Sequence, residues 1–300
     1  MKCLNYIILS LLLLLMMESC QECKTPKQGE IAQATTEETT RIVSLNGTLT
    51  ELLYAVGYGD KIVGVDVTST YPAAALSKTN LGHARQLNAE AILSLKPTLI
   101  LVDEEGSQSP AIITLKKSGL PIGVVEVPQT LEGSLQAAHQ LEQLLGVDFD
   151  TKALEANIHQ NKQALAQFLE QHPQQPKVLF IYARGAQTMM VGGKHTFAEK
   201  MIQLAGGTLA LPAIEGFKPL TPEALLEGQP EVILMFDSGL QSLAAEGAAT
   251  PALEQLLQIP AIAQTPAGAH KKVVTMEGLY LSGFGPRAST AALELAKAIH

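Results

Sequence analysis

Short apolar runs alternate with polar stretches along the first part of this chain. Four of these runs have the length of buried strands, at residues 42–45, 62–65, 99–102 and 123–127. A helix is expected over residues 89–95, ending before Pro97, and Thr48 or Thr50 is expected to cap an earlier helix that runs through Tyr54. Strands and helices at such short spacing are typical of a parallel α/β layer.

The pattern changes to a helical period between residues 131 and 172. Apolar side chains recur there every three or four residues on a background of strong helix formers. The segment that begins at Gly146 interrupts the period, and Asp150 or Thr151 can cap a second helix. A second α/β pattern follows Pro176, with strands expected at residues 178–181, 231–236 and 273–276 and a closing helix at residues 288–299.

Two segments of the chain resemble each other. Residues 87–101 align without a gap with residues 220–234, so that each residue matches the one 133 positions later. Each copy reads as a capped helix, a proline and a buried strand, and both copies contain Leu-x-x-Glu-Ala. Chance similarity between two such units would explain the match, but the shared motif favours a duplication or a matched function. The predicted fold is therefore α/β, with two α/β lobes that have central parallel sheets and are joined by a long backbone helix.

The first 19 residues read as a signal peptide. Lys2 precedes an apolar run that is too short to span a bilayer comfortably, and the run stops at Ser19-Cys20. A small residue directly before cysteine resembles a bacterial lipoprotein cleavage box, although Glu18 departs from the strict form. Cys20 is then the lipidated first residue of the mature chain. An uncleaved anchor or soluble secretion is the alternative.

The predicted order of segments follows from these patterns. It is a signal peptide at residues 1–19, a lipidated flexible tether at 20–40, an N-terminal α/β lobe at 41–130, a helical linker at 131–175 and a C-terminal α/β lobe at 176–300. Two lobes joined by a linker have a cleft between them, and ligands of such sheets bind at the carboxyl ends of the strands. A binding site is therefore expected between the lobes.

Composition excludes several classes of function. The formal net charge of -8 argues against nucleic-acid binding, which needs clustered Lys and Arg. All three cysteines lie in the first 23 residues, so the folded part cannot use a disulfide, a zinc-thiolate site or a cysteine nucleophile. The sequence contains no serine nucleophile elbow, phosphate-binding loop or zinc-protease motif. The protein is predicted not to be an enzyme.

Several stretches resemble one family. Residues 41–57 are similar to the opening of class III (helical-backbone) periplasmic binding proteins, which serve siderophores, cobalamin and haem. Residues 65–72, 216–224 and 277–287 resemble the haem-binding subgroup of that family. The resemblance extends over about residues 41–299 and implies the class III fold. It also implies that the protein binds haem b in the cleft between its lobes and delivers it to an ABC-type importer.

The resemblance gives Tyr71 the role of axial ligand to the haem iron. A phenol oxygen is a hard donor that suits ferric iron. Pro72 disfavours the α conformation at Tyr71 and biases this residue towards an extended form, from which the ring can project into the cleft. A tyrosine packed on a loop is the alternative. His195, expected at the start of the first helix of the second lobe, is a candidate for a second contact with the haem.

Charged side chains complete the expected site. A haem has two propionates, and guanidinium groups form paired, charged hydrogen bonds with carboxylates. The candidates for propionate binding are Arg85, Arg287, Lys218 and Lys78. Glu90 and Glu223 occupy the same place in the two copies of the repeat. The resemblance implies that these two carboxylates dock onto arginines of the two permease subunits.

The expected partners are haem, an ABC permease dimer with its ATPase, and a membrane reached through the lipid on Cys20. The protein is expected to be an exported monomer of the periplasm or cell envelope that does not bind nucleic acid. Binding of a siderophore, cobalamin or a divalent metal is the alternative. Siderophore and cobalamin binders often use aromatic platforms, whereas this chain has no Trp and only 4% aromatic residues, so haem is favoured.

Overall fold

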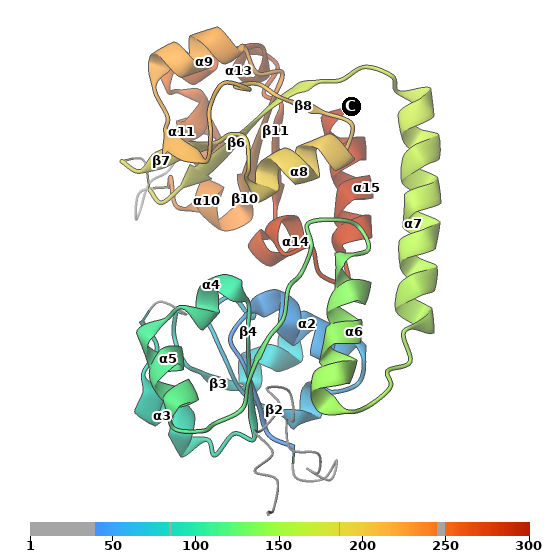
Figure 1. Cartoon of the computed structure of the whole chain (residues 1–300). Coiled ribbons are helices and arrows are strands. Elements are labelled where there is room, and N and C mark those ends of the chain that lie inside the picture. The colour runs from blue at the N-terminus through green and yellow to red at the C-terminus, as the bar shows by residue number, and fades with distance from the viewer. Residues whose placement is uncertain (1–39, 84–85, 186, 245–249) are drawn as a thin grey trace, which may run out of the picture. The chain divides into compact units, whose positions relative to one another are not determined.

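Two β-sheets flanked by helices make up the part of the chain that the structure describes (Figure 1). The structure is a computed structural model that describes residues 40–300 apart from 84–85, 186 and 245–249. The described residues belong to one compact unit, residues 37–300. The predicted α/β class is confirmed. The signal peptide and the tether lie outside the described residues, so their bounds stay predictions.

The N-terminal lobe contains a sheet of five parallel strands in the order β3-β2-β1-β4-β5. Both faces of this sheet are covered, and for this reason β1 and β4 are apolar at nearly every position. Ile42 and Leu101 pack towards α2 and the linker, while Val43 and Ile100 pack towards α3 and α5. The elements are β1 (Ile42–Ser44), α2 (Gly47–Ala55), β2 (Ile62–Val65), β3 (Thr79–Asn80), α3 (Ala89–Ser94), β4 (Leu99–Val102), α4 (Glu104–Ser107), α5 (Pro110–Lys117) and β5 (Ile122–Val124), with 3-10 turns at Gly59–Lys61 and Ala73–Ser77.

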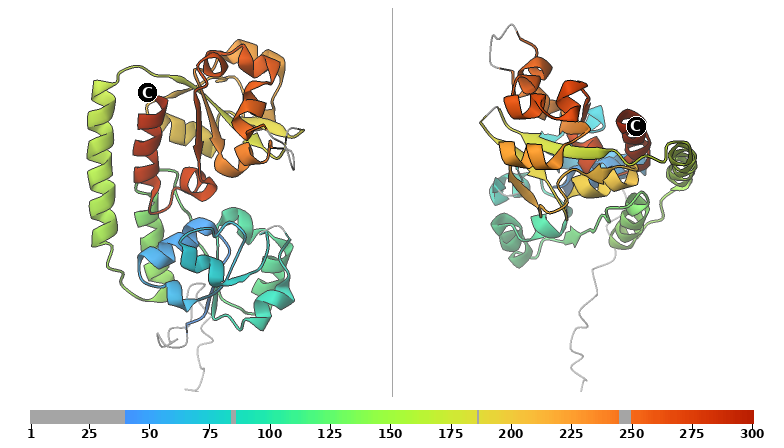
Figure 2. Two further views of the ribbon diagram at one scale, coloured as in Figure 1. Left: turned by 180° about the vertical axis from the view of Figure 1, so that it is seen from behind. Right: turned by 90° about the horizontal axis from the view of Figure 1, so that it is seen from above.

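Two helices, α6 (Gly133–Leu145) and α7 (Lys152–Gln171), form the linker, as predicted from the helical period. Gly146 ends α6 in the left-handed conformation (φ 68°), which a residue without Cβ adopts at low cost. With 20 residues, α7 extends over about 30 Å. It packs against the closing helix α15 (Ala288–Ile299), and α6 packs against α2 (Figures 1 and 2).

The C-terminal lobe has a six-stranded sheet in the order β11-β10-β6-β7-β9, with β8 paired to β6. Its central strands are parallel, as predicted, but β7 and β9 are antiparallel strands at one edge that the sequence patterns did not reveal. The elements are β6 (Lys177–Ala183), β7 (Met189–Gly192), α8 (Phe197–Leu204), β8 (Thr208–Leu209), β9 (Phe217–Pro219), α9 (Pro222–Gly228), β10 (Val232–Phe236), α10 (Asp237–Gln241), α11 (Ala252–Leu257), α12 (Pro260–Ala263), α13 (Pro266–Ala269), β11 (Val273–Met276), α14 (Gly278–Ser282) and α15.

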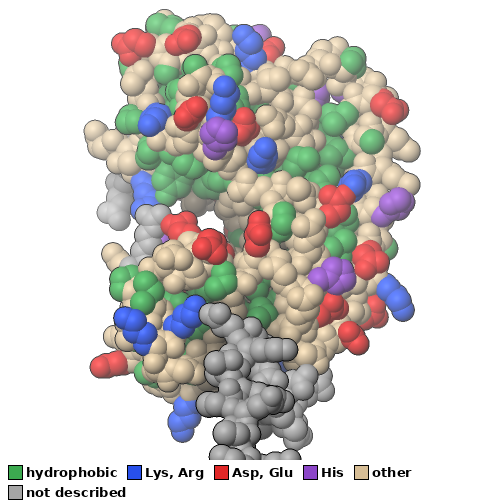
Figure 3. Space-filling model, viewed as in Figure 1, with side chains coloured by type: hydrophobic (Ala, Val, Ile, Leu, Met, Phe, Trp, Pro, Cys, Tyr) green, Lys and Arg blue, Asp and Glu red, His purple; other side chains and the backbone are tan. Residues whose placement is uncertain are grey.

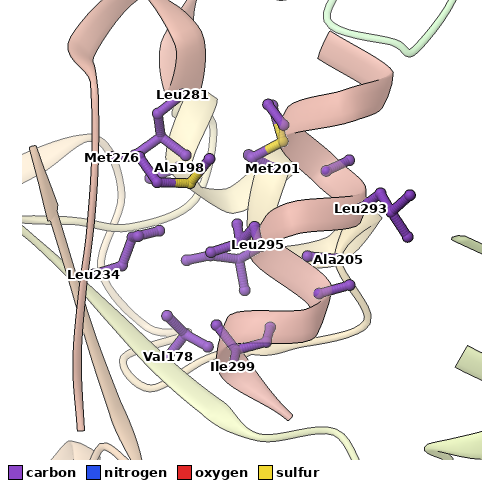
Figure 4. Close-up of a cluster of buried hydrophobic side chains, with 14 of the residues drawn as sticks. Val178, Ala198, Met201, Ala205, Leu234, Met276, Leu281, Leu293, Leu295 and Ile299 are labelled. Carbon is purple, nitrogen blue, oxygen red and sulfur yellow. The ribbon is translucent and has the colours of Figure 1, made fainter. Parts of the chain in front are cut away.

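One of the two core clusters of the C-terminal lobe lies between its sheet and the helices α8, α14 and α15 (Figure 4). Val178 and Leu234 point from the strands towards Leu295 and Ile299 on α15, and Met201 fills the space beside them from α8. Each fully buried aliphatic side chain contributes about 1.5–3 kcal/mol through removal of apolar surface from water. This packing fixes the position at which α14 and α15 begin.

The two copies of the sequence repeat fold in the same way. Helices α3 and α9 begin at Ala89 and Pro222, and strands β4 and β10 begin at Leu99 and Val232, each pair separated by the 133-residue offset. A side-chain oxygen at the residue before each helix, Asn88 or Thr221, accepts hydrogen bonds from the first turn. The repeat is therefore present in the structure as well as in the sequence.

Crossing a bilayer requires a long apolar helix, and none of the helices in the described ranges meets that requirement.

Candidate ligand-binding site

Three cavities meet at Thr68, beyond the carboxyl end of β2. Their volumes are about 320, 280 and 460 Å3. The first lies within the N-terminal lobe, and the other two are lined by residues of both lobes. In Figure 3 the surface is hollowed between the lobes, and acidic side chains lie along one edge of the hollow. We refer to the two cavities shared between the lobes as the interlobe crevice, and its position agrees with the expected cleft.

Asn46, two residues after the end of β1, organises the floor of the crevice. Its side-chain oxygen accepts from the N–H groups of Thr48 and Leu49 at 2.9 and 3.2 Å, which makes Asn46 the cap of α2. Its amide nitrogen donates to Asp103 Oδ2 at 2.9 Å. The expectation that Thr48 or Thr50 caps this helix was wrong, because the helix begins earlier and the hydroxyl groups of both threonines have other partners. Thr48 donates to the carbonyl oxygen of Gly283 in the other lobe at 2.8 Å.

The loop after β2 is fixed by buried polar contacts. Asp66 is only 2% exposed and accepts hydrogen bonds from Thr68 Oγ1 and Ser69 Oγ at 2.7 and 2.9 Å. Burial raises the pKa of Asp66, and the charge of Asp103 adds to this, while the two hydroxyl groups act in the opposite direction. Gly47 lets the loop approach α2, because a Cβ at this position would lie 2.3 Å from the carbonyl oxygen of Thr68.

Tyr71 directly follows Thr70, which lines the larger cavity of the crevice, and the Tyr71 ring has a cation beside it. The guanidinium carbon of Arg287 lies 3.7 Å from the centre of the Tyr71 ring, while 43% of Tyr71 stays exposed. The same guanidinium carbon lies 4.8 Å from the centre of the Tyr280 ring on α14. The structure thus brings together Tyr71 and Arg287, two residues that the sequence analysis selected.

A buried carboxylate holds Arg287 in place. Nε and Nη2 of Arg287 donate to Oε1 and Oε2 of Glu51, both at 2.8 Å. The Glu51 side chain is 4% exposed and that of Arg287 is 26% exposed. Glu51 belongs to α2 of the N-terminal lobe, so this paired hydrogen bond joins the two lobes.

Glu277 makes a further connection between the lobes. Its Oε1 accepts from Thr70 Oγ1 at 3.1 Å, and its Oε2 lies 3.8 Å from Arg287 Nη2. Both oxygens of Glu277 also cap α14, since they accept from the N–H groups of Leu279 and Tyr280. The residue next to Tyr71 is thereby tied to the first turn of α14.

The surroundings shift the pKa values of Tyr280 and Arg287. Burial raises the pKa of Tyr280 well above its usual value, and hydrogen bonding and charge from Glu294 add to this effect. Tyr280 therefore stays a neutral phenol. For Arg287, burial alone would lower the pKa, but Glu51, Glu277 and Tyr71 together raise it above its usual value. Arg287 is a permanent cation beside the exposed ring of Tyr71.

The other predicted site residues do not belong to this cluster. His195 is exposed, has a left-handed backbone (φ 61°) and donates its N–H to Glu199 Oε2 at 2.8 Å, two residues before α8 begins. Lys218 is exposed on β9, and Lys78 is half-buried after the 3-10 turn at residues 73–77. Arg85 lies outside the described residues, as does Cys20. Glu90 and Glu223 are exposed in the first turns of α3 and α9.

The sequence analysis missed Glu51 and Glu277. One signal for Glu51 was available, since it is a lone carboxylate among apolar residues of α2, and carboxylates are seldom buried unless they are paired. Glu277 directly precedes a short helix, a place where an acidic side chain can accept from free N–H groups.

No group of three or more His, Cys, Asp or Glu side chains that could hold a metal ion occurs among the described residues.

Comparison with known proteins identifies the family. The model of the family described as periplasmic binding protein matches residues 42–278, which is most of the chain. The chain belongs to the periplasmic binding protein family. Proteins of this family bind substrates and do not transform them, and they work outside the cytoplasmic membrane, in the periplasm or cell envelope.

Individual members of the periplasmic binding protein family resemble this chain over most of its length. The apo structure of the periplasmic haem-binding protein RhuT from Roseiflexus sp. RS-1 has 36% sequence identity and a TM-score of 0.79, over 87% of this chain and 97% of RhuT. The uncharacterised ABC transporter substrate-binding lipoprotein YvrC of Bacillus subtilis is 26% identical over 88% of this chain and 81% of its own. A vitamin B12-binding protein of Yersinia pestis is 29% identical over 67% of this chain and 70% of its own.

Proposed function

We propose that this protein binds haem in the interlobe crevice, through the phenolate of Tyr71, and delivers it to an ABC importer. The observation that carries the proposal is the exposed Tyr71 ring, next in the chain to the crevice residue Thr70, with Arg287 fixed against it by Glu51. The 36% identity with the haem-binding protein RhuT supports the same ligand.

The chemistry of this pair suits a ferric haem. A phenolate oxygen is a hard anionic donor, and tyrosine serves as an axial haem ligand in other proteins. The guanidinium of Arg287, which stays charged, lies beside the ring of Tyr71. Tyr280, whose pKa is raised, does not compete for the iron.

The crevice also offers surfaces for the rest of a haem. Phe236 and Leu279 line its larger cavity and provide apolar contact for a porphyrin face. Arg287 uses two of its five N–H groups on Glu51, which leaves donors for a propionate. Arg85, Lys218 and Lys78 are the other proposed propionate partners.

Further details of the ligand and the partners extend the proposal. The ligand is haem b, with His195 as a second contact. Glu90 and Glu223 dock onto the two permease subunits, which work with an ATPase. The protein is exported by its signal peptide, anchored through a lipid on Cys20, and acts as a monomer.

Cobalamin is the second candidate ligand, because a vitamin B12-binding protein is 29% identical to this chain over 204 residues. Haem is favoured by Tyr71, since a phenolate is a harder donor than cobalamin requires.

Titration of the purified mature protein with ferric haem, and separately with cobalamin, tests the proposal. We expect saturable haem binding with the absorption spectrum of a tyrosinate-bound ferric haem, and no binding of cobalamin at the same concentration. The Tyr71→Ala variant should lose that spectrum. Tight cobalamin binding without haem binding would reverse the assignment of the ligand, and a tyrosinate spectrum retained by Tyr71→Ala would remove Tyr71 from the iron.

A further inference from the structure

Two exposed leucines occupy matching places in the two lobes. Leu93 on α3 and Leu226 on α9 are separated by 133 positions, which is the offset of the repeat. Each is 47% exposed. The residues directly before them, Ile92 and Leu225, are buried in the cores of their lobes. Each helix therefore points one aliphatic side chain inward and the next one outward, in the same register.

Each leucine shares its helix face with a glutamate. Glu90 and Glu223 lie three positions before Leu93 and Leu226, a spacing that puts side chains next to each other on a helix. Both glutamates are exposed, and neither carboxylate has an ion pair or a side-chain hydrogen bond with another of the described residues. Each lobe thus presents an exposed acidic group next to an exposed apolar group.

The matched exposure is specific to this pair. Single exposed leucines are ordinary on protein surfaces and need no explanation. Among the described residues, however, Leu93 and Leu226 are the only two exposed large apolar side chains that the repeat relates to each other. A shared external contact accounts for both positions at once.

We infer that Glu90 with Leu93, and Glu223 with Leu226, form two copies of one docking surface. The partner that fits them is a pair of identical membrane subunits related by a two-fold axis, each with a basic group beside an apolar socket. The inference rests on the proposed function and adds the leucines to it. The glutamates give orientation and fast association with a basic surface, whereas burial of the leucines gives most of the affinity.

The position of the two helices is consistent with one partner that contacts both lobes. Helices α3 and α9 both lie on the side remote from the linker helix α7 (Figures 1 and 2). The net charge of -8 also favours a basic partner over a second copy of this chain.

The test uses the mature protein and the haem importer of the same organism, with its permease dimer and ATPase, reconstituted in lipid nanodiscs. Binding of the haem-free protein to the nanodiscs is measured for the parent, Leu93→Ser, Leu226→Ser and the double leucine variant. Leu253→Ser is the matched control, because Leu253 is also exposed (37%) but lies on α11, outside the repeat. Thermal unfolding and haem titration of each variant show whether folding and ligand binding are unchanged.

We expect each single substitution to weaken binding to the importer about fivefold and the double variant about 25-fold, with the control within twofold of the parent. Haem affinity should be the same in all of them. A double variant that binds the importer within twofold of the parent overturns the inference, even if the parent binds haem. Sedimentation of the parent as a dimer that the double variant abolishes would also overturn it, in favour of a second copy as the partner. Failure of the parent to bind haem would count against the proposed function alone, because docking is read on the haem-free protein.

Discussion

Arg287 lies over the ring of Tyr71, with its guanidinium carbon 3.7 Å from the ring centre, although the two residues are 216 positions apart in the chain. Tyr71 remains 43% exposed beside this guanidinium. Glu51 fixes the guanidinium through two hydrogen bonds of 2.8 Å. One ion pair therefore both joins the lobes and defines the surroundings of the proposed iron ligand.

Replacement of Arg287 by alanine should lower the free energy of unfolding by about 3 kcal/mol, because it leaves the carboxylate of Glu51 buried without a partner. Urea denaturation of the haem-free protein measures this change. Arg184→Ala is the matched control, since exposed Arg184 contacts the ring and hydroxyl of Tyr182 without a buried carboxylate, and it should cost less than about 1 kcal/mol. Equal losses of unfolding free energy in the two variants would show that the interlobe ion pair stabilises the protein no more than the exposed contact of Arg184 does.

Tyr71→Phe should weaken haem binding about 100-fold or more, because it removes the oxygen that coordinates the iron and keeps the ring that stacks on Arg287. Absorption titration with ferric haem measures the affinity. Tyr280→Phe is the control, because Tyr280 lies beside the same guanidinium but stays neutral, and it should bind haem nearly as the parent does. The assignment of the iron ligand would be wrong if Tyr280→Phe lost haem affinity and Tyr71→Phe kept it.

Asn46→Ala should cost about 2 kcal/mol of stability, since it removes the cap of α2 together with the hydrogen bond to Asp103. Asn88→Ala removes the cap of the shorter, exposed helix α3 and should cost about 1 kcal/mol. Urea denaturation of both variants gives the comparison. A smaller loss for Asn46→Ala than for Asn88→Ala would argue that Asn46 does not organise the crevice floor.

The stability of the protein should depend on pH through His300. Its ring lies 5.8 Å from Phe168 and 6.0 Å from His172, centre to centre. Burial lowers the pKa of His300, and the charges of His172 and Lys272 lower it further, against a backbone hydrogen bond to Ala205 that acts in the opposite direction. The folded state then binds a proton less readily than the unfolded state. The contribution of His300 to stability is complete above the usual imidazole pKa and is lost as the pH falls from there to the lower pKa of the folded state.

His300→Phe should keep the aromatic contacts and remove this part of the pH dependence. Unfolding free energies of parent and variant between about pH 7.5 and pH 5.5 measure the difference in slope. The stability of the parent should fall more steeply towards pH 5.5 than that of the variant. Parallel curves would mean that His300 titrates in the folded protein as it does in the unfolded chain.

Much of the fold could be predicted where local pattern and burial agree. The strands at residues 62–65, 99–102 and 273–276 and the helix at 288–299 have the predicted bounds, because each is an apolar segment ended by turn or helix-capping residues. The antiparallel strands β7 and β9 were missed because tertiary contacts decide their pairing. Strand β7 pairs with β6 in a hairpin, and β9 pairs with β7 only after the chain has passed through α8 and β8. Short strands of this kind have no periodicity of their own.

The site was predictable only in part. Tyr71 and Arg287 stand in recognisable motifs, so each could be selected alone. Glu51 could not be assigned a partner, since the arginine that binds it is 236 positions away and nothing in the α2 sequence indicates an ion pair between lobes. Caps are equally ambiguous from sequence, because Asn46, Thr48 and Thr50 are all suitable residues and tertiary partners decide between them.

The meeting of three cavities at Thr68 has a consequence for attempts to retarget this scaffold to other cargo. Substitution of Thr68 alone would change the walls of all three cavities at once. The hydroxyl of Thr68 accepts from Gly47 and donates to Asp66, and its carbonyl leaves no space for a methyl group on residue 47. Redesign of specificity is therefore best begun at the cavity walls, with this threonine and its glycine neighbour held constant.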